Sequence, residues 1–158
     1  MVVSHAIVLA TQRSLESGNR LSARAVARIR QTLEGLAAVG VREIAVVDGS
    51  RSEALREQLA LHELPGLHVR VLANLSWKNL SGSAVLMGRQ WIDEGERCLV
   101  VRGGRPLDAG TLRRLVATGV ERQGRGGCDA AIVVAAASDV DARDEVRVKL
   151  DRDHDSDL

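Results

Sequence analysis

The sequence predicts an α/β protein in which a mostly parallel sheet is covered by helices on both faces, a three-layer α/β/α Rossmann-like fold. Two patterns predict it. Apolar segments of strand length alternate with amphipathic segments of helical period along most of the chain, which is typical of consecutive βαβ units. The strand segments are also nearly continuous apolar runs, as expected for strands that are buried on both faces.

The expected elements follow one another in a regular order. Strands are expected at residues 5–11, 43–47, 68–72, 97–101, 129–136 and 145–150, and helices at residues 23–39, 52–62, 80–92 and 107–120. Gly40 is expected to end the first helix and Ser52 to cap the second, while Asp108 is expected near the start of the fourth, where a carboxylate suits the helix dipole. Trp91 lies among apolar residues of the third helix and is predicted to be a core residue.

Composition restricts the class of protein. The chain has 158 residues with 22 Lys+Arg and 21 Asp+Glu, a formal net charge of +1, so no global field favours nucleic acid or a membrane surface. No apolar run reaches the length of about 18 residues that a membrane span needs, and no signal peptide is recognisable. Cys98 and Cys128 lie in apolar runs and are expected to be reduced, buried thiols of a cytoplasmic protein. We expect one domain at residues 1–150 and an acidic disordered tail at residues 151–158.

The expected ligand site lies where the strands end. The carboxyl ends of parallel strands meet at one edge of a sheet, so the loops at residues 11–22, 48–50, 73–81 and 102–107 are predicted to share that edge. The first loop carries Gln12, Arg13, Gly18, Asn19 and Arg20, which suit a phosphate near a helix start. It matches neither the GxGxxG dinucleotide pattern nor the P-loop pattern.

Several segments share order and spacing with a known family. Ala10 and the run Gly18-Asn19-Arg20-Leu21 are similar to a stretched LAAGxGxRL loop, and residues 32–47 are similar to the helix and strand that follow it. Asn74-x-x-Trp77 with Gly82, the run at residues 100–104 and the stretch at residues 139–150 match later motifs. The chain therefore resembles the sugar-phosphate and polyol-phosphate nucleotidyltransferases, including inositol-phosphate cytidylyltransferases.

The resemblance implies a nucleotidyltransferase fold and a set of nucleotide-binding positions. Those positions are Ala10, Thr11, Gln12, Arg13, Gly18, Asn19, Arg20, Asn74, Trp77, Gly82 and Gly103. Trp77 is a candidate for stacking on a base, with simple packing as its alternative role.

The sequence departs from the family in its catalytic motifs. The Lys-Pro pair has no match, and Gly104 stands where the family has the metal-binding Asp of its Gly-Asp motif. The remaining candidates for catalysis are Arg20, Arg24 and Asp108, with Asp48 as an alternative carboxylate, although a helix cap is the expected role of Asp108. Because positioning and charge neutralisation supply most of the catalysis of phosphoryl transfer, these losses predict a degenerate, impaired enzyme.

Three functions stay open at this stage. The first is an impaired nucleotidyltransferase-like domain, a pseudoenzyme that retains weak binding of a nucleotide or sugar phosphate. The second is an active nucleotidyltransferase that uses rearranged ligands and Mg²⁺ to form an NDP-sugar or CDP-polyol. The third is a structural or protein-interaction domain. No metal site is expected from the residues themselves, and neither the oligomeric state nor a protein partner follows from the sequence.

Overall fold

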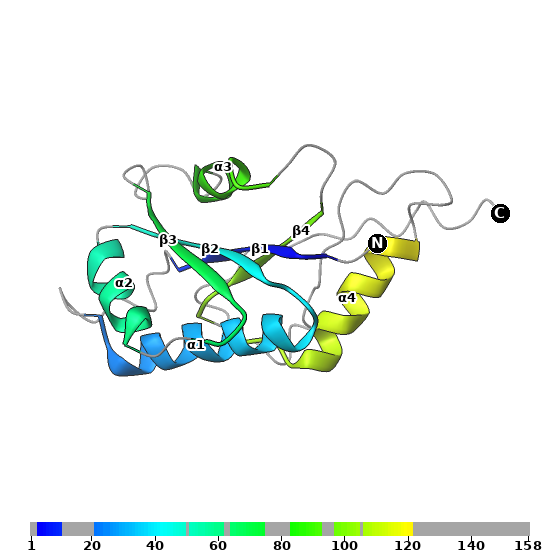
Figure 1. The fold of residues 1–158 in the computed structure, drawn as a ribbon, viewed down its shortest axis with the longest axis horizontal. Helices are drawn as coiled ribbons and strands as arrows, with labels where there is room; N and C mark the ends of the chain where they lie inside the picture. The colour runs from blue at the N-terminus through cyan, green and yellow to red at the C-terminus, as the bar shows by residue number, and fades with distance from the viewer. Residues whose placement is uncertain are drawn as a thin grey trace, which may run out of the picture.

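A computed structural model describes residues 3–10, 21–49, 51–61, 64–74, 83–92, 97–104 and 106–121. Strands and helices alternate from one end of this part to the other (Figure 1). The order is β1 (His5–Leu9), α1 (Ala23–Ala38), β2 (Glu43–Asp48), α2 (Ser52–Ala60), β3 (His68–Ala73), α3 (Ser83–Arg89), β4 (Cys98–Arg102) and α4 (Ala109–Glu121). The strands expected at residues 129–136 and 145–150, the tail at residues 151–158 and Cys128 lie outside the described residues.

The described strands form one parallel sheet in the order β3-β2-β1-β4. Helix α3 lies on one face of the sheet, and α1, α2 and α4 lie on the other (Figure 1). The predicted three-layer α/β/α architecture is therefore confirmed. The first residues of the strands are in register, with His5 opposite both Glu43 and Cys98, and Glu43 opposite His68.

The two faces of the sheet have separate cores, because side chains alternate along each strand. Toward α1, Val8 and Val46 pack with Ile29, Leu33 and Leu36, all at most 1% exposed. Toward α3, Ile7 and Val47 pack with Ala84 at the start of that helix. The central strands β1 and β2 are thus buried on both sides, which explains their apolar sequences.

Helix α1 has well-formed caps at both ends. The Oγ atom of Ser22 accepts a hydrogen bond of 3.1 Å from the N–H of Ala25. At the other end, Gly40 has φ +97°, and Gly40 and Val41 donate hydrogen bonds to the carbonyls of Ala37 and Leu36, both of 3.1 Å. This is a Schellman motif, which requires a residue in the left-handed region. The prediction that Gly40 ends the helix is confirmed.

Two expectations for α2 and α3 were wrong. Ser52 is the first helical residue rather than the cap, and the capping position is held by Arg51 without a side-chain hydrogen bond. The third helix covers only Ser83–Arg89 among the described residues, and Leu86 on it is 66% exposed. The apolar residues at helical spacing thus predicted a helix that extends further toward Ile92, and a wider buried face, than α3 has.

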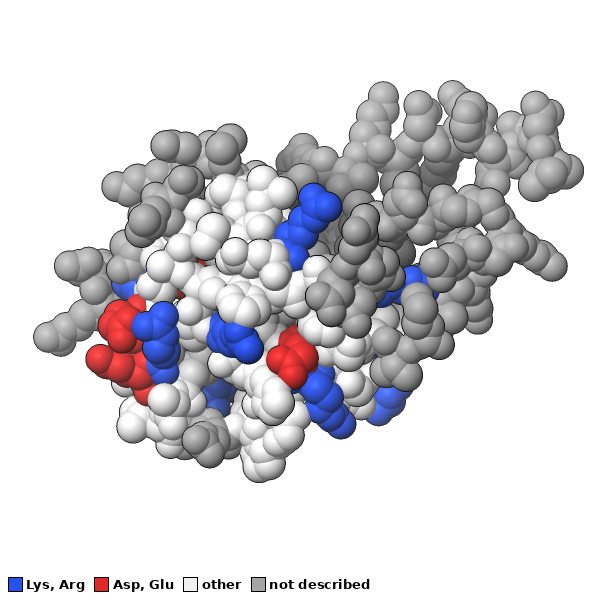
Figure 2. Space-filling model, turned by 45° about the horizontal axis from the view of Figure 1, so that its top comes forward, with Lys and Arg blue, Asp and Glu red and all other residues white. Residues whose placement is uncertain are grey.

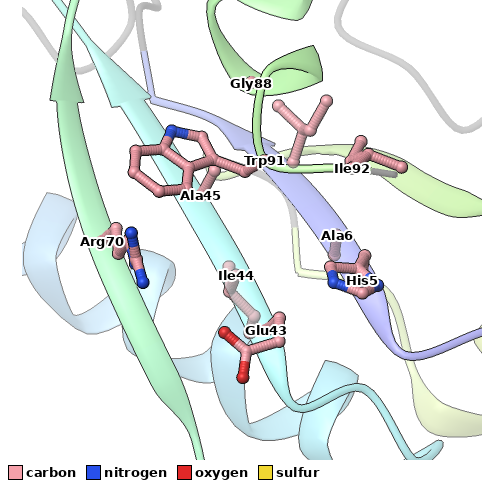
Figure 3. Close-up of a pocket in the computed structure, with 10 residues that line it drawn as sticks. His5, Ala6, Glu43, Ile44, Ala45, Arg70, Gly88, Trp91 and Ile92 are labelled. Carbon is pink, nitrogen blue, oxygen red and sulfur yellow. The ribbon is translucent and has the colours of Figure 1, made fainter. Parts of the chain in front are cut away.

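Trp91 is not a core residue. It lies in a turn after α3, is 41% exposed, and its ring lies 4.0 Å from the Cζ atom of Arg70 (Figure 3). The helix ends before Trp91, and the backbone N–H of Trp91 donates a hydrogen bond of 3.2 Å to the carbonyl of Gly88. The indole therefore lies against the open face of β3 instead of the interior.

Cys98 begins β4 as a half-buried free thiol, and burial raises its pKa. None of the described helices is both long and apolar enough to span a membrane.

Candidate functional site

The described strand ends meet at one edge, as predicted for a parallel sheet. Three backbone hydrogen bonds join them: Ala10 N–H to Val47 O at 2.8 Å, Asn74 N–H to Asp48 O at 2.7 Å, and Gly103 N–H to Leu9 O at 2.9 Å. Ala10, Asp48, Asn74 and Gly103 are thereby brought together. We call this the carboxyl edge. The remaining nucleotide-binding candidates lie outside the described residues: Thr11, Gln12, Arg13, Gly18, Asn19, Arg20, Trp77 and Gly82.

Ala10 and Gly103 at this edge face the protein core. Ala10 is 1% exposed and belongs to the core cluster beside α1. A Cβ atom on Gly103 would lie 3.1 Å from Val8 Cγ1 and 3.3 Å from Ile29 Cγ1. A Cβ at position 103 would crowd Val8 and Ile29, so packing against α1 favours glycine here, which is a structural role that the resemblance did not indicate. Only the backbone of these two residues faces the edge.

Asn74 connects the end of β3 to the start of α3. It is 3% exposed, and its Nδ2 donates a hydrogen bond of 2.8 Å to the Oγ of Ser83. Its backbone N–H is bound to Asp48 O. Asn74 therefore ties the residue that follows β3 to the first residue of α3.

Asp48 is the carboxylate that ends β2, and it is 4% exposed. By alternation it lies on the same side of the sheet as Ile44 and Val46, toward α1 and α2. A carboxylate at this place suits a cation or a hydroxyl donor at the edge. Within the described residues, however, no three His, Cys, Asp or Glu side chains converge where they could hold a metal ion.

Asp108 is a helix cap. Its Oδ1 accepts a hydrogen bond of 2.9 Å from the N–H of Thr111, and its Oδ2 accepts one of 2.6 Å from the Thr111 hydroxyl. The hydroxyl bond, then the backbone bond, lowers the pKa of Asp108. The neighbouring Leu107 carbonyl lies against Gly35, near the end of α1 that is remote from the carboxyl edge. The expected capping role is confirmed, and this position does not favour a catalytic one.

Three arginines belong to elements that begin or end at the carboxyl edge. Arg24 lies exposed in the first turn of α1, Arg51 precedes α2, and Arg102 ends β4. Two helix starts and these guanidinium groups can bind an anion.

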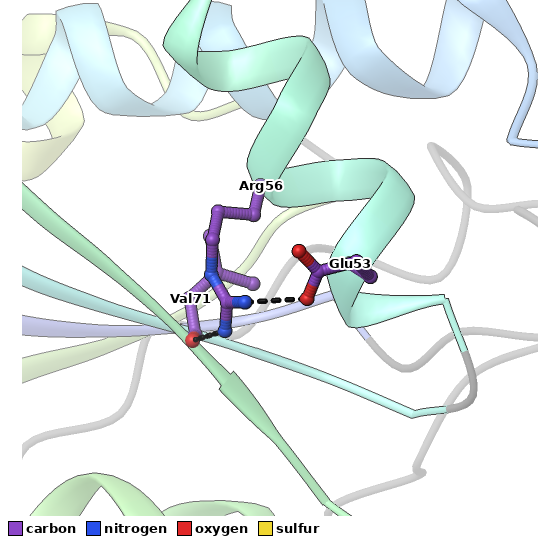
Figure 4. A network of polar contacts seen from close by, with 3 residues as sticks. All are labelled: Glu53, Arg56 and Val71. Atoms are coloured by element: carbon purple, nitrogen blue, oxygen red, sulfur yellow. Dashed lines mark hydrogen bonds and ion pairs between the residues drawn. The ribbon is translucent and has the colours of Figure 1, made fainter.

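A separate polar network ties α2 to β3. Glu53, in the first turn of α2, is paired with Arg56 at 2.5 Å, and Arg56 also donates a hydrogen bond of 3.2 Å to Val71 O of β3 (Figure 4). Elsewhere on the visible face, acidic and basic side chains are interspersed (Figure 2).

A pocket of about 130 Å³ lies away from the carboxyl edge, on the α3 face near the amino ends of the strands. His5, Glu43 and Arg70 line it from three adjacent strands, and Gly88, Trp91 and Ile92 line it from α3 and the following turn (Figure 3). Sequence reasoning missed this pocket. One pattern in the sequence could have indicated it: His5, Glu43 and Arg70 are polar residues near the starts of three strands, at positions that point to the same face of the sheet.

The fold is similar to that of solved structures, one of which is a nucleotidyl transferase. The chain aligns with Rv0371c from Mycobacterium tuberculosis at TM-score 0.51 and 19% identity, covering 73% of this chain and 60% of that one. A 4-diphosphocytidyl-2C-methyl-D-erythritol synthase from Anaerococcus prevotii gives TM-score 0.53, 16% identity and coverages of 72% and 49%. A nucleotidyl transferase from Methanothermobacter, Mth528, gives TM-score 0.53, 24% identity and coverages of 72% and 56%.

These similarities define a nucleotidyltransferase-like α/β fold, as the motifs had led us to expect. The chain spans between 49% and 60% of the length of these three structures. A further structure of Rv0371c is a complex with manganese. No family model matches the chain, and no curated protein matches it by sequence.

Proposed function

We propose that this chain is a nucleotidyltransferase-like domain, impaired in catalysis, that binds a nucleotide or a sugar or polyol phosphate at the carboxyl edge. The observation that carries the proposal is the group of arginines on the described elements of that edge, Arg24, Arg51 and Arg102. A phosphate ligand needs cations and unpaired N–H groups, and the edge offers guanidinium groups beside helix starts.

The residues of the carboxyl edge also support the proposal that catalysis is impaired. Nucleotidyl transfer to a phosphate acceptor concentrates negative charge around the α-phosphorus, and enzymes neutralise that charge with metal ions and cations. Mg²⁺ in such sites is typically held by one or two carboxylates together with substrate phosphates. Asp48 is the strand-end carboxylate among the described residues of the edge, and Asp108 is occupied as a cap. These residues alone do not form a metal site, so we assign no catalytic step to a metal.

An active enzyme is the second candidate, and Asp48 favours it. Its carboxylate belongs to the strand next to β1 and is held at the edge by the sheet itself. In that case Asp48 would contribute one oxygen ligand to a divalent cation, as the manganese complex of Rv0371c suggests for a related fold. The products would be pyrophosphate and an NDP-sugar or CDP-polyol.

A thermal-shift titration with the four nucleoside triphosphates, each with and without Mg²⁺, tests the proposal. A ligand at about 100 times its Kd adds roughly 2.7 kcal/mol of stability, which raises Tm by several degrees in a chain of this size. We expect a rise that does not require Mg²⁺ and that is reduced in Arg24→Gln. The matched control is Arg113→Gln, which changes an exposed arginine of α4.

The alternative outcomes separate the candidates. A rise that depends strictly on Mg²⁺ and disappears in Asp48→Asn would support the active enzyme, and release of pyrophosphate would establish it. No rise with any nucleotide or polyol phosphate would refute binding at this edge and leave a structural or protein-interaction domain.

A further inference from the structure

The pocket on the α3 face holds opposite charges that are not paired with each other. Glu43 on β2 and Arg70 on β3 both line it. Glu43 is instead hydrogen-bonded to His68, with 2.6 Å between Oε1 and Nδ1. The Cζ atom of Arg70 lies 4.0 Å from the ring of Trp91, and Arg70 forms no ion pair with any described carboxylate. The pocket therefore presents an acceptor and a donor across an open space.

The stacking on Trp91 orients the guanidinium group of Arg70. An arginine whose plane lies on an aromatic ring keeps its N–H edge free to form two parallel hydrogen bonds with a carboxylate. Figure 3 shows Arg70, Glu43 and His5 on adjacent strands around the space below Trp91. Holding the side chain in place before binding reduces the entropy that a ligand must offset.

Glu43 and Arg70 lie on neighbouring strands of the same sheet. Arg70 is in register with Ala45, two residues beyond Glu43 on β2. With strands about 4.8 Å apart and a rise of about 3.3 Å per residue, the Cα atoms of Glu43 and Arg70 are about 8 Å apart. An α-amino acid carries an ammonium group and a carboxylate on one carbon atom, so it offers one group of each charge to such a pair of neighbouring side chains.

The size and the walls of the pocket restrict the rest of the ligand. Its volume is about 130 Å³, and Ile7, Ala45, Gly88 and Ile92 provide an apolar lining. A cavity of about 150 Å³ in another protein holds one benzene molecule, so a nucleotide does not fit here. A short aliphatic side chain does.

From the acidic and basic side chains that line one pocket, the oriented arginine and the apolar lining, we propose that this pocket is a second binding site, separate from the carboxyl edge, for an α-amino acid with a short aliphatic side chain. The carboxylate of the ligand binds Arg70, its ammonium group binds the carboxylate of Glu43 beside His68, and its side chain lies against Ile92. The site does not depend on nucleotide binding.

Calorimetric titration of the full chain with L-valine tests the site, with millimolar affinity expected for a ligand of about eight non-hydrogen atoms. Isovalerate and isobutylamine are valine without its ammonium group and without its carboxylate, respectively, and should bind much more weakly. Since hydrogen bonds to charged groups contribute strongly, Arg70→Gln and Glu43→Gln should each weaken valine binding by roughly tenfold or more. Arg113→Gln and the carboxyl-edge variant Arg24→Gln should bind valine as the wild type does.

The possible results all decide the question. Absence of valine binding at high millimolar concentrations would refute the proposal. Equal binding of valine and isovalerate would refute recognition of a zwitterion. Unchanged binding by Arg70→Gln, with its circular dichroism spectrum intact, would place the ligand elsewhere and refute the proposal. Loss of valine binding in Arg24→Gln would show that the ligand uses the carboxyl edge, which also contradicts the proposal.

Discussion

Replacement of Gly88 by alanine tests how closely α3 packs on the sheet. A Cβ atom at this position would lie 2.7 Å from both Cδ1 and Cγ1 of Ile7 and 2.9 Å from its Cγ2. Ile7 is 1% exposed and central in β1, so it has little room to move. In an unhindered helix, glycine to alanine is stabilising by roughly 0.5–1 kcal/mol. The contact with Ile7 therefore decides whether Gly88→Ala raises or lowers the free energy of unfolding.

We expect Gly88→Ala to be destabilising by about 1–2 kcal/mol, because overpacking a filled core costs typically 1–3 kcal/mol and exceeds the helix gain. For a chain of this length, each kcal/mol corresponds to about 2–4 °C in Tm, so Tm should fall by about 2–8 °C. Urea unfolding followed by far-ultraviolet circular dichroism measures the change. Leu86→Ala, on the exposed side of the same helix, is the control and should change stability by at most about 0.5 kcal/mol.

A double-mutant cycle makes the reasoning refutable. Ile7→Ala removes the Cδ1, Cγ1 and Cγ2 atoms that the new methyl group would meet, and by itself it costs about 2–5 kcal/mol. The double variant should lose less stability than the sum of the single variants, with a coupling of at least about 0.5 kcal/mol. If Gly88→Ala instead raises the urea midpoint, or if the two changes are additive, α3 does not contact β1 in this way.

Two further predictions concern Asp108 and Cys98. Hydrogen bonds from Thr111 lower the pKa of Asp108 below its ordinary 3.8, so the stability that the cap contributes is present above pH 3.8 and is lost as the pH falls through the lowered pKa. Asp108→Ala should therefore lower the urea midpoint at pH 7 but not at a pH below the lowered pKa. An equal loss at both pH values would contradict the cap. Burial raises the pKa of Cys98, so its thiol should react slowly with iodoacetamide in the native chain. In a Cys128→Ser background at pH 8, mass spectrometry should show slower alkylation of the native chain than of the urea-unfolded chain. Equal rates would show an exposed thiol.

The layers of the fold were predictable because they depend on local patterns. The apolar runs at β1 and β2 predict strands buried on both faces, and alternating strands and helices favour a parallel sheet. The end of α1 was predictable for the same reason, since Gly40 readily adopts the left-handed conformation that the Schellman motif requires. The meeting of Ala10, Asp48, Asn74 and Gly103 at one edge follows from parallel pairing alone.

The roles of individual side chains at that edge were not predictable from motif spacing. Gly103 matches a ligand-binding position in the resemblance, yet its missing Cβ makes room for Val8 and Ile29, which are distant in sequence. Asn74 matches a base-side position, yet its side chain is hydrogen-bonded to Ser83. A motif specifies the residue type at a position, and both packing and ligand contact can require the same type.

By itself, the sequence determined the order of the elements, the parallel sheet and the edge where the strands end, because hydrophobic period and turn residues act over a few positions. Only the tertiary structure decided that Trp91 lies on Arg70 rather than in the core, and that Glu43 and Arg70 face one pocket without pairing. Burial and charge pairing depend on which distant segments meet. Residues separated by tens of positions become neighbours only when β1, β2, β3 and α3 are packed together.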